Sequence, residues 1–235
     1  MESMSRRWFV PGLVRCRYAH MLRENGDMSM TAIIEREHGR FRIKAGRLGG
    51  DFKARAFRKP PTKKMRLIAE TAADSPEEAI DALIRKLDEA DQASLAARRV
   101  DPVCDVKVPL RAEFDEALEH LDFSDSEAWM LIRHAHAADV GCTRSELAGL
   151  LGEVEVGAVE KFYMRLCRSI LHFIAPVTAI VNGKEIPVDT PVFLWRVEPD
   201  PEPRDERLCL HPEFREALMD HVAWERRASL QGAIA

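Results

Sequence analysis

Apolar and polar residues alternate over two short stretches in the first third of the chain. In residues 40–45 (RFRIKA) and again in residues 52–56 (FKARA), every second residue is apolar and those between are basic. A period of two is typical of a β-strand with one buried face. The turn residues between the stretches, Leu48-Gly49-Gly50-Asp51, predict that the two strands are neighbours in an antiparallel sheet.

Two more strands and one helix complete this region. Residues 31–36 and 65–73 are predicted as strands, and Ser75-Pro76-Glu77-Glu78 has the residues of a helix start. Apolar residues then recur at helical spacing from Ile80 to Leu87, which predicts that one stripe of the helix packs on the sheet. The predicted order is β-β-β-β-α, or β-β-β-α if residues 31–36 only extend the sheet.

The pattern becomes mainly helical after Pro109. Four helices, three short strands and a last helix are predicted over residues 109–121, 124–138, 144–151, 156–173, 177–181, 184–188, 192–197 and 212–227. Asn182-Gly183 is a strong signal for a two-residue β-hairpin. The fold class is therefore predicted to be α+β.

These patterns predict a division of the chain into four parts. Residues 1–29 are interpreted as a flexible N-terminal arm and residues 30–92 as a sheet-plus-helix domain. Residues 93–108 are interpreted as a linker, because Arg98-Arg99 and scattered charges replace the periodic pattern there. Residues 109–235 form the second predicted domain.

Charge is distributed very unevenly along the chain. Residues 36–66 contain twelve Lys or Arg and two acidic residues, a net charge of +10, whereas the whole chain has a net charge of −4. Residues 109–235 carry 13 basic and 23 acidic side chains, a net charge of −10. A segment as cationic as residues 36–66 attracts polyanions, of which nucleic acid is the commonest.

The alternation predicts that the basic side chains of the two strands share one face of the sheet. We expect this face to carry positive charge only, and we expect Phe57 to lie on the same side. The candidate nucleic-acid-binding residues of this region are Arg40, Arg42, Lys44, Arg47, Lys53, Arg55, Arg58, Lys63 and Lys64. In its three-stranded version, a sheet backed by one helix over residues 31–90 resembles the small DNA-binding domains of the AP2 and integrase N-terminal type, a resemblance that implies a sheet lying in the major groove.

A second resemblance lies in the C-terminal half. The run Thr143–Gly152 (TRSELAGLLG) resembles the first helix and turn of a helix-turn-helix, and with the Asn182-Gly183 hairpin the region resembles a winged helix. This resemblance implies that the next helix enters the major groove of DNA. It would present three further candidates, Lys161, Arg165 and Arg168. The acidic charge of the region favours an alternative role in dimerisation or in docking a partner, and both interpretations stay open.

Other kinds of chemistry find little support. The five cysteines are odd in number and have no C-x-x-C spacing, and His134 and His136 are two residues apart on a predicted helix, so they cannot share a metal ion. The common nucleotide-binding, hydrolase and metalloprotease motifs do not occur. We therefore predict no catalytic residues, no cofactor and no metal. Trp129 and Trp195 are interpreted as core residues.

The sequence contains no apolar run long enough to cross a bilayer and no recognisable secretory signal, which predicts a cytoplasmic protein without membrane contact. We expect a non-enzymatic protein that binds nucleic acid, with duplex DNA favoured, as a transcriptional regulator or an accessory subunit of a DNA-processing or defence system. The alternative is a protein–protein adaptor whose basic face docks an acidic partner. A dimer, formed through the acidic C-terminal domain, is also expected.

Overall fold

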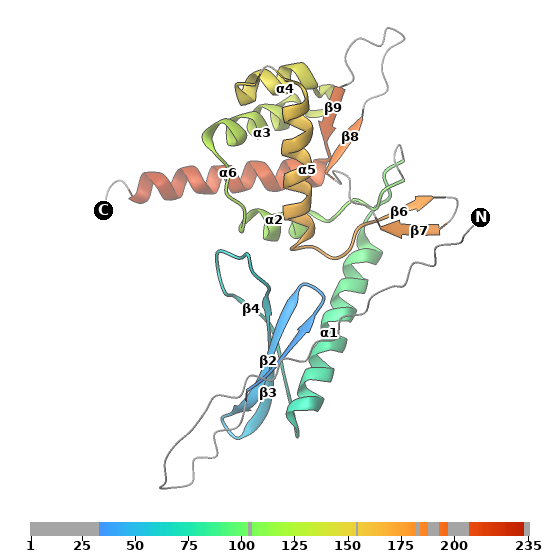
Figure 1. The fold of residues 1–235 in the computed structure, drawn as a ribbon, viewed down its shortest axis with the longest axis vertical. Helices are drawn as coiled ribbons and strands as arrows, with labels where there is room; N and C mark the ends of the chain where they lie inside the picture. The colour runs from blue at the N-terminus through green and yellow to red at the C-terminus, as the bar shows by residue number, and fades with distance from the viewer. Residues whose placement is uncertain are drawn as a thin grey trace, which may run out of the picture. The chain divides into compact units, whose positions relative to one another are not determined.

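The computed structural model describes residues 33–102, 105–153, 155–181, 184–187, 193–196 and 207–232. It has mixed α and β structure, which confirms the predicted fold class (Figure 1). The chain forms two compact units. Unit 1 takes the chain up to Lys59 together with Met65–Leu87, and unit 2 takes Pro60–Lys64 and the chain from Asp88 onward. The predicted N-terminal arm, residues 1–29, lies outside the described residues.

Unit 1 contains a four-stranded antiparallel sheet in the order β1-β2-β3-β4. The strands are β1 (Ile34–His38), β2 (Phe41–Leu48), β3 (Asp51–Arg58) and β4 (Leu67–Ala73). The first strand pairs with β2 over its whole length, so the four-stranded version of the prediction is confirmed. The turn between β2 and β3 needs two glycines, because Gly49 and Gly50 have φ angles of 69° and 103°, where other residues are strained.

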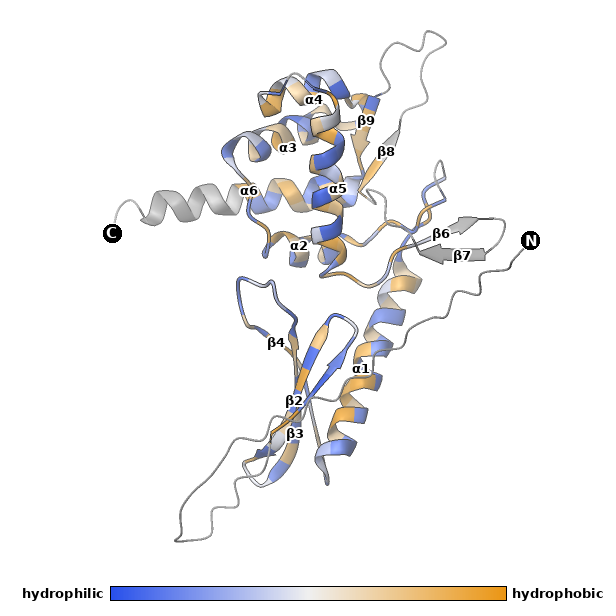
Figure 2. Cartoon of the chain, in the orientation of Figure 1, coloured by the Kyte–Doolittle hydropathy of each residue, from blue (hydrophilic) through white to orange (hydrophobic). Residues whose placement is uncertain are grey.

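Helix α1 (Pro76–Ala97) covers one face of this sheet (Figure 1). The apolar residues of the alternating stretches are buried together with the apolar stripe of the helix. Figure 2 shows apolar and polar residues alternating along β2 and β3 and apolar residues recurring along α1. The buried set is Phe41, Ile43, Ala45, Ala54, Ala56, Ala79, Ile80, Leu83 and Leu87. The packing of the helix stripe on the sheet is therefore as predicted.

Helix α1 ends ten residues later than its apolar stripe. The segment Asp88–Ala97 contains four alanines, which favour a helix, but it has no apolar periodicity, so the sequence pattern placed a linker from residue 93 onward. The division between the two units falls inside this helix, after Leu87. The chain that follows the helix turns back on itself, with Val100 bridged to Lys107.

Unit 2 contains the helices α2 (Arg111–Leu118), α3 (Asp125–Ala137), α4 (Arg144–Leu151), α5 (Gly157–Leu171) and α6 (Pro212–Gly232), with the short 3₁₀ helix η1 (Ala138–Val140) after α3. Two helices of unit 2, α3 and α4, begin where capping residues predicted them. The Oγ atom of Ser124 accepts a hydrogen bond from the backbone N–H of Glu127 at the start of α3. Thr143 and Glu146 make the same arrangement at the start of α4.

The strands of unit 2 form two separate sheets. Strands β6 (Thr178–Val181) and β7 (Lys184–Pro187) pair as the predicted hairpin, although Asn182-Gly183 itself lies outside the described residues. The second sheet has the order β5-β9-β8, with β5 (Cys142–Thr143), β8 (Leu194–Arg196) and β9 (Arg207–Leu210). Strand β5 lies between α3 and α4. It is only two residues long, so no alternation could reveal it.

The core of unit 2 is built around aromatic side chains. The ring of Phe214 from α6 lies 5.1 Å from Phe114 of α2 and 4.7 Å from Phe193, and Phe193 lies 5.8 Å from Tyr163 of α5. Trp129 was predicted to belong to this core, but it is 50% exposed, because its position on α3 faces outward. The side chain of Trp195 lies outside the described residues. Among the described helices, none combines the length and apolar character that crossing a bilayer would require.

Candidate nucleic-acid interface

The strand register of unit 1 decides which side chains share the face opposite α1. Residues paired across neighbouring strands point to the same side of a sheet. Lys44 is paired with Arg55, Gly46 with Lys53 and Arg42 with Phe57. The residues between them are the buried ones that face α1. We call this outer side the basic face, and four of the predicted residues, Arg42, Lys44, Lys53 and Arg55, lie on it together with Phe57.

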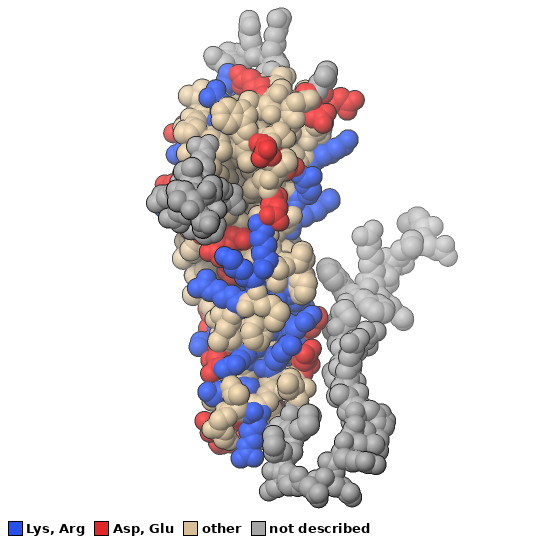
Figure 3. All heavy atoms as spheres, turned by 90° about the vertical axis from the view of Figure 1, so that its left-hand side faces the viewer, with Lys and Arg blue, Asp and Glu red and all other residues tan. Residues whose placement is uncertain are grey.

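The basic face is not uniformly positive, so that expectation is wrong. The register pairs Glu35 with Lys44, Glu37 with Arg42 and Glu70 with Arg55. Glu37 was left off the face because the sequence pattern ended the first strand at Arg36, whereas β1 continues to His38. Glu35 lay inside the predicted strand, but only the register with β2 places it beside Lys44. Figure 3 shows Lys and Arg gathered over unit 1, with Asp and Glu beside them.

Each of these three carboxylates forms at least one ion pair. Glu35 lies 3.2 Å from the Nζ atom of Lys44, and Glu37 lies 2.9 Å from the Nζ atom of Lys59. Glu70 contacts two basic side chains, those of Lys53 and Arg55. The hydrogen bond and charge of Lys59 hold the pKa of Glu37 below its ordinary value. The face therefore keeps an excess of positive charge, but several of its cations already have an anionic neighbour.

Three of the predicted residues near this sheet have other positions. Arg58 belongs to the buried face of β3, is only 7% exposed and holds its guanidinium 4.8 Å from the centre of the Phe41 ring. Its guanidinium is therefore largely shielded from solvent, and its role in binding phosphate stays a prediction. Arg40 stacks over the same ring at 4.6 Å. Arg47, at the exposed end of β2, donates a hydrogen bond to the backbone oxygen of Gly50 and so braces the turn.

Lys63 and Lys64 do not belong to unit 1. The segment Pro60–Lys64 is part of unit 2, and the Nζ atom of Lys63 lies 2.5 Å from both the backbone oxygen of Leu121 and a carboxylate oxygen of Asp122. Lys63 therefore stabilises the loop between α2 and α3. Lys64 is exposed.

Helix α5 carries the three candidates predicted in the C-terminal half. Lys161, Arg165 and Arg168 are exposed and lie at i, i+4 and i+7, which places them on one side of the helix. Arg165 forms an ion pair with Glu127 of α3. Glu160, beside Lys161, lies 3.4 Å from Arg144. This side of α5 thus has mixed charge and not a continuous cationic surface.

A shallow hollow on unit 2 lies between α3, α4 and β9. Its lining combines basic, acidic and apolar side chains, among them Arg133, His136, Cys142, Glu146, Leu150 and Arg207. Arg207 donates a hydrogen bond of 2.9 Å to the backbone oxygen of Gly141 and lies 3.9 Å from Glu146. Burial raises the pKa of the Cys142 thiol, with a further rise from Glu146, so this cysteine is not an activated thiolate.

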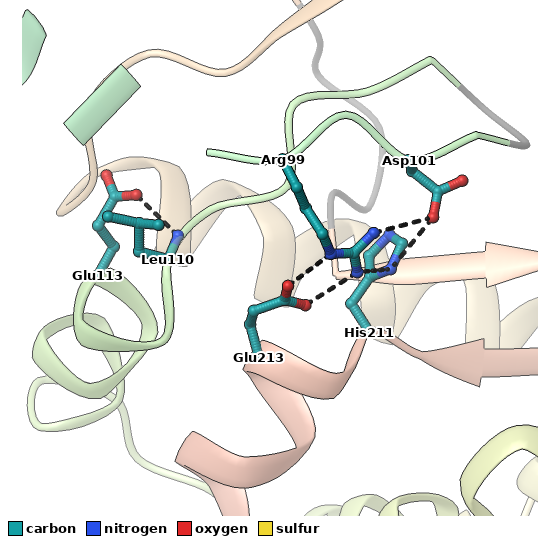
Figure 4. Close-up of polar contacts among 6 residues, drawn as sticks. All are labelled: Arg99, Asp101, Leu110, Glu113, His211 and Glu213. Atoms are coloured by element: carbon teal, nitrogen blue, oxygen red, sulfur yellow. Dashed lines mark hydrogen bonds and ion pairs between the residues drawn. The ribbon is translucent and has the colours of Figure 1, made fainter. Parts of the chain in front are cut away.

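A partly buried cluster of polar side chains was missed by the sequence analysis (Figure 4). The guanidinium of Arg99 lies 2.6 Å from Glu213 and 3.5 Å from Asp101, and the Nδ1 atom of His211 lies 3.7 Å from Asp101. Its signal in the sequence was the pair Arg98-Arg99, which had been assigned to a linker. The cluster connects the chain after α1 to the start of α6.

Arg98 anchors the same segment on the opposite side. Its side chain is fully buried and lies 2.5 Å from a carboxylate oxygen of Glu113, and it donates hydrogen bonds to the backbone oxygens of Ala175 and Pro176. Glu113 in turn accepts a hydrogen bond from the backbone N–H of Leu110 at the start of α2 (Figure 4). Arg98 and Arg99 are therefore structural residues of unit 2.

Within the part of the chain that the structure describes, no group of three or more His, Cys, Asp or Glu side chains is placed to hold a metal ion. No protein-family model matches the chain, and comparisons with curated proteins and with solved structures also find no match.

Proposed function

We propose that this protein binds nucleic acid through the basic face of unit 1, with duplex DNA as the favoured ligand. The observation that carries the proposal is the gathering of Arg42, Lys44, Lys53 and Arg55 on the outer side of two neighbouring strands. Four long cations on one surface can contact several phosphates at once, and each contact releases counterions.

The shape of this surface supports duplex DNA as the ligand. Strands β2 and β3, the central pair of the four-stranded sheet, are joined by a tight turn, and some β-sheet proteins read DNA by placing strands in a groove. Phe57 is half-buried on the same face, where an aromatic edge could meet a thymine methyl group. Phosphate contacts would position these strands without reading sequence.

We further propose that unit 2 contains a winged helix. The order α3-β5-α4-α5-β8-β9 supports this. In a winged helix, a short strand that precedes the helix-turn-helix pairs with a β-hairpin that follows it, and here β5 pairs with β9 of the β8–β9 hairpin. The hairpin in this proposal is β8–β9 and not the Asn182-Gly183 hairpin. The ten residues that connect its strands, 197–206, include five acidic residues and one basic residue, which disfavours contact with phosphates. A protein-facing role for unit 2 is therefore favoured.

A transcriptional regulator, or an accessory subunit of a DNA-processing or defence system, would use both units in this way. The ion pairs of the basic face favour one second candidate, a protein–protein adaptor. In such an adaptor, carboxylates of an acidic partner would replace the protein's own carboxylates as neighbours of the basic side chains. That partner could be the acidic unit of a second copy.

Binding to labelled duplex DNA, single-stranded DNA and duplex RNA at two salt concentrations tests the proposal by fluorescence anisotropy. The Arg42→Ala/Lys53→Ala variant is expected to bind at least tenfold more weakly, with a salt slope shallower by roughly two units. The matched control is Arg85→Ala/Arg133→Ala, which removes the same charge at exposed positions outside the basic face. Equal losses in both variants would show that only net charge matters, and an unchanged affinity in the first would refute the proposal.

A further inference from the structure

Glu70 occupies a special position on the basic face. It lies on β4 directly opposite Arg55 of β3, and its carboxylate lies 2.5 Å from the Nε atom of Arg55 and 3.5 Å from the Nζ atom of Lys53. One carboxylate thus contacts two of the four cations that carry the proposed function. By comparison, Glu35 contacts Lys44 alone among these four.

The environment of Glu70 keeps it ionised and close to its partners. The hydrogen bond from Arg55 lowers the pKa of this carboxyl, and the charge of Lys53 acts in the same direction. The side chain is 30% exposed, as is that of Lys53, and Arg55 is 41% exposed. An incoming anion can therefore reach both cations from solvent, where it meets the carboxylate already bound to them.

We propose that Glu70 is an internal competitor for phosphate that sets the affinity and selectivity of the basic face. This inference rests on the proposed function. A phosphate that contacts Lys53 or Arg55 must either displace Glu70 or lie beside its negative charge. Both outcomes weaken binding, and they do so most for a ligand that offers few phosphates to the face. A duplex, with its high charge density, loses the smallest part of its affinity.

Removing the charge of Glu70, although this side chain contacts the candidate interface, should strengthen the binding of nucleic acid. Replacing the carboxylate of Glu70 by an amide removes one negative charge about 4–6 Å from a bound phosphate. At effective dielectric constants close to that of water, this corresponds to a roughly three- to tenfold rise in affinity. The rise should be larger for single-stranded than for duplex ligands.

A four-variant cycle tests the inference by fluorescence anisotropy at low salt: the unaltered protein, Glu70→Gln, Lys53→Ala/Arg55→Ala, and the triple variant that combines them. Glu70→Gln is expected to bind three- to tenfold more tightly, with a steeper salt dependence. In the background without Lys53 and Arg55, the same change should have less than a twofold effect. Glu35→Gln should give a smaller rise, and Glu89→Gln, an exposed site on α1, should give none.

The outcomes separate this inference from the proposed function. If the unaltered protein binds and Lys53→Ala/Arg55→Ala binds weakly, but Glu70→Gln binds equally or less well, the competitor role is refuted and the nucleic-acid interface stands. If Glu70→Gln strengthens binding equally in both backgrounds, its effect is one of net charge and the inference also fails. If the unaltered protein binds no nucleic acid, both the competitor role of Glu70 and the proposed function are refuted. Circular dichroism checks that all four variants keep the fold.

Discussion

His134 is held by two hydrogen bonds that determine its tautomer. Its Nε2 atom lies 2.7 Å from the backbone oxygen of Leu208, and because a carbonyl oxygen only accepts, Nε2 must carry the proton. Its Nδ1 atom lies 2.6 Å from the hydroxyl oxygen of Tyr163 and accepts a hydrogen bond from that hydroxyl group. This neutral imidazole connects α3, α5 and β9. Burial lowers its pKa, as burial also does for His211.

These two histidines predict that stability decreases on mild acidification. A histidine with a lowered pKa in the folded state binds fewer protons there than in the unfolded chain, whose histidines titrate near pH 6.5. The stabilising contribution is complete above that pH and is lost as the pH falls toward the lowered pKa. Within this pH range, each histidine lowers the free energy of unfolding by up to about 1.4 kcal/mol for each unit by which the pH falls.

Urea unfolding between about pH 7.5 and pH 5 measures this effect, because Glu127 and Glu213, whose pKa values are lowered, titrate below that range. The pH dependence should be weaker in His134→Gln and unchanged in His136→Gln, whose side chain is exposed. A constant free energy of unfolding across the range would contradict the prediction.

At the scale of elements, a single glycine permits the junction between α3 and β5. Gly141 has a φ angle of 67°, and a Cβ atom there would lie 2.6 Å from both the Sγ atom of Cys209 and the backbone oxygen of Leu208. Strand β9 therefore packs directly against the backbone of the turn. This close approach allows β5, two residues long, to pair with β9 and so join the sheet to α4.

We predict that Gly141→Ala destabilises the protein by about 2 to 4 kcal/mol, from backbone strain and the overlap with β9. Gly149 provides the matched control, because it is exposed within α4 and a Cβ atom there has no neighbour within 4 Å. Gly149→Ala should stabilise by roughly 0.5 to 1 kcal/mol, since Ala is the better helix former. Thermal unfolding of both variants checks this, and equal effects of the two substitutions would refute the packing argument.

At the scale of the whole molecule, the two units carry opposite charge. Counted over the residues of each unit, the net charge is +6 for unit 1 and −10 for unit 2. Two such regions in one chain can attract those of a second copy, an attraction that salt would screen. Self-association of this kind is what the adaptor alternative requires.

Light scattering at low and high salt separates the two proposals for the basic face. If the face serves nucleic acid, the molar mass of the nucleic-acid-free protein should be the same for the unaltered chain and for Arg42→Ala/Lys53→Ala at both salt concentrations. A dimer held through unit 2 is compatible with that result. A mass that decreases with salt and also in the double variant would instead support docking of the basic face on the acidic unit of another copy.

Local patterns were sufficient wherever a structural element depends on its own residues. The alternation of residues 40–45 and 52–56 predicted β2 and β3, and the capping residues Ser124 and Thr143 predicted where α3 and α4 begin. In each case neighbouring residues supply the signal, since a strand face and a helix cap are formed by side chains only a few positions apart. The concentration of positive charge is likewise a property of the sequence alone.

Contacts between distant residues were decided by the tertiary structure alone. The register of β1 and β4 placed Glu35 and Glu70 among the cations, burial shielded Arg58 from solvent, and β9 selected the two-residue strand β5 as its partner. The sequence by itself determined most of the elements, the α+β class and the sign of charge in each region. Which charges meet depends on pairing between segments far apart in the chain, and no local period encodes that pairing.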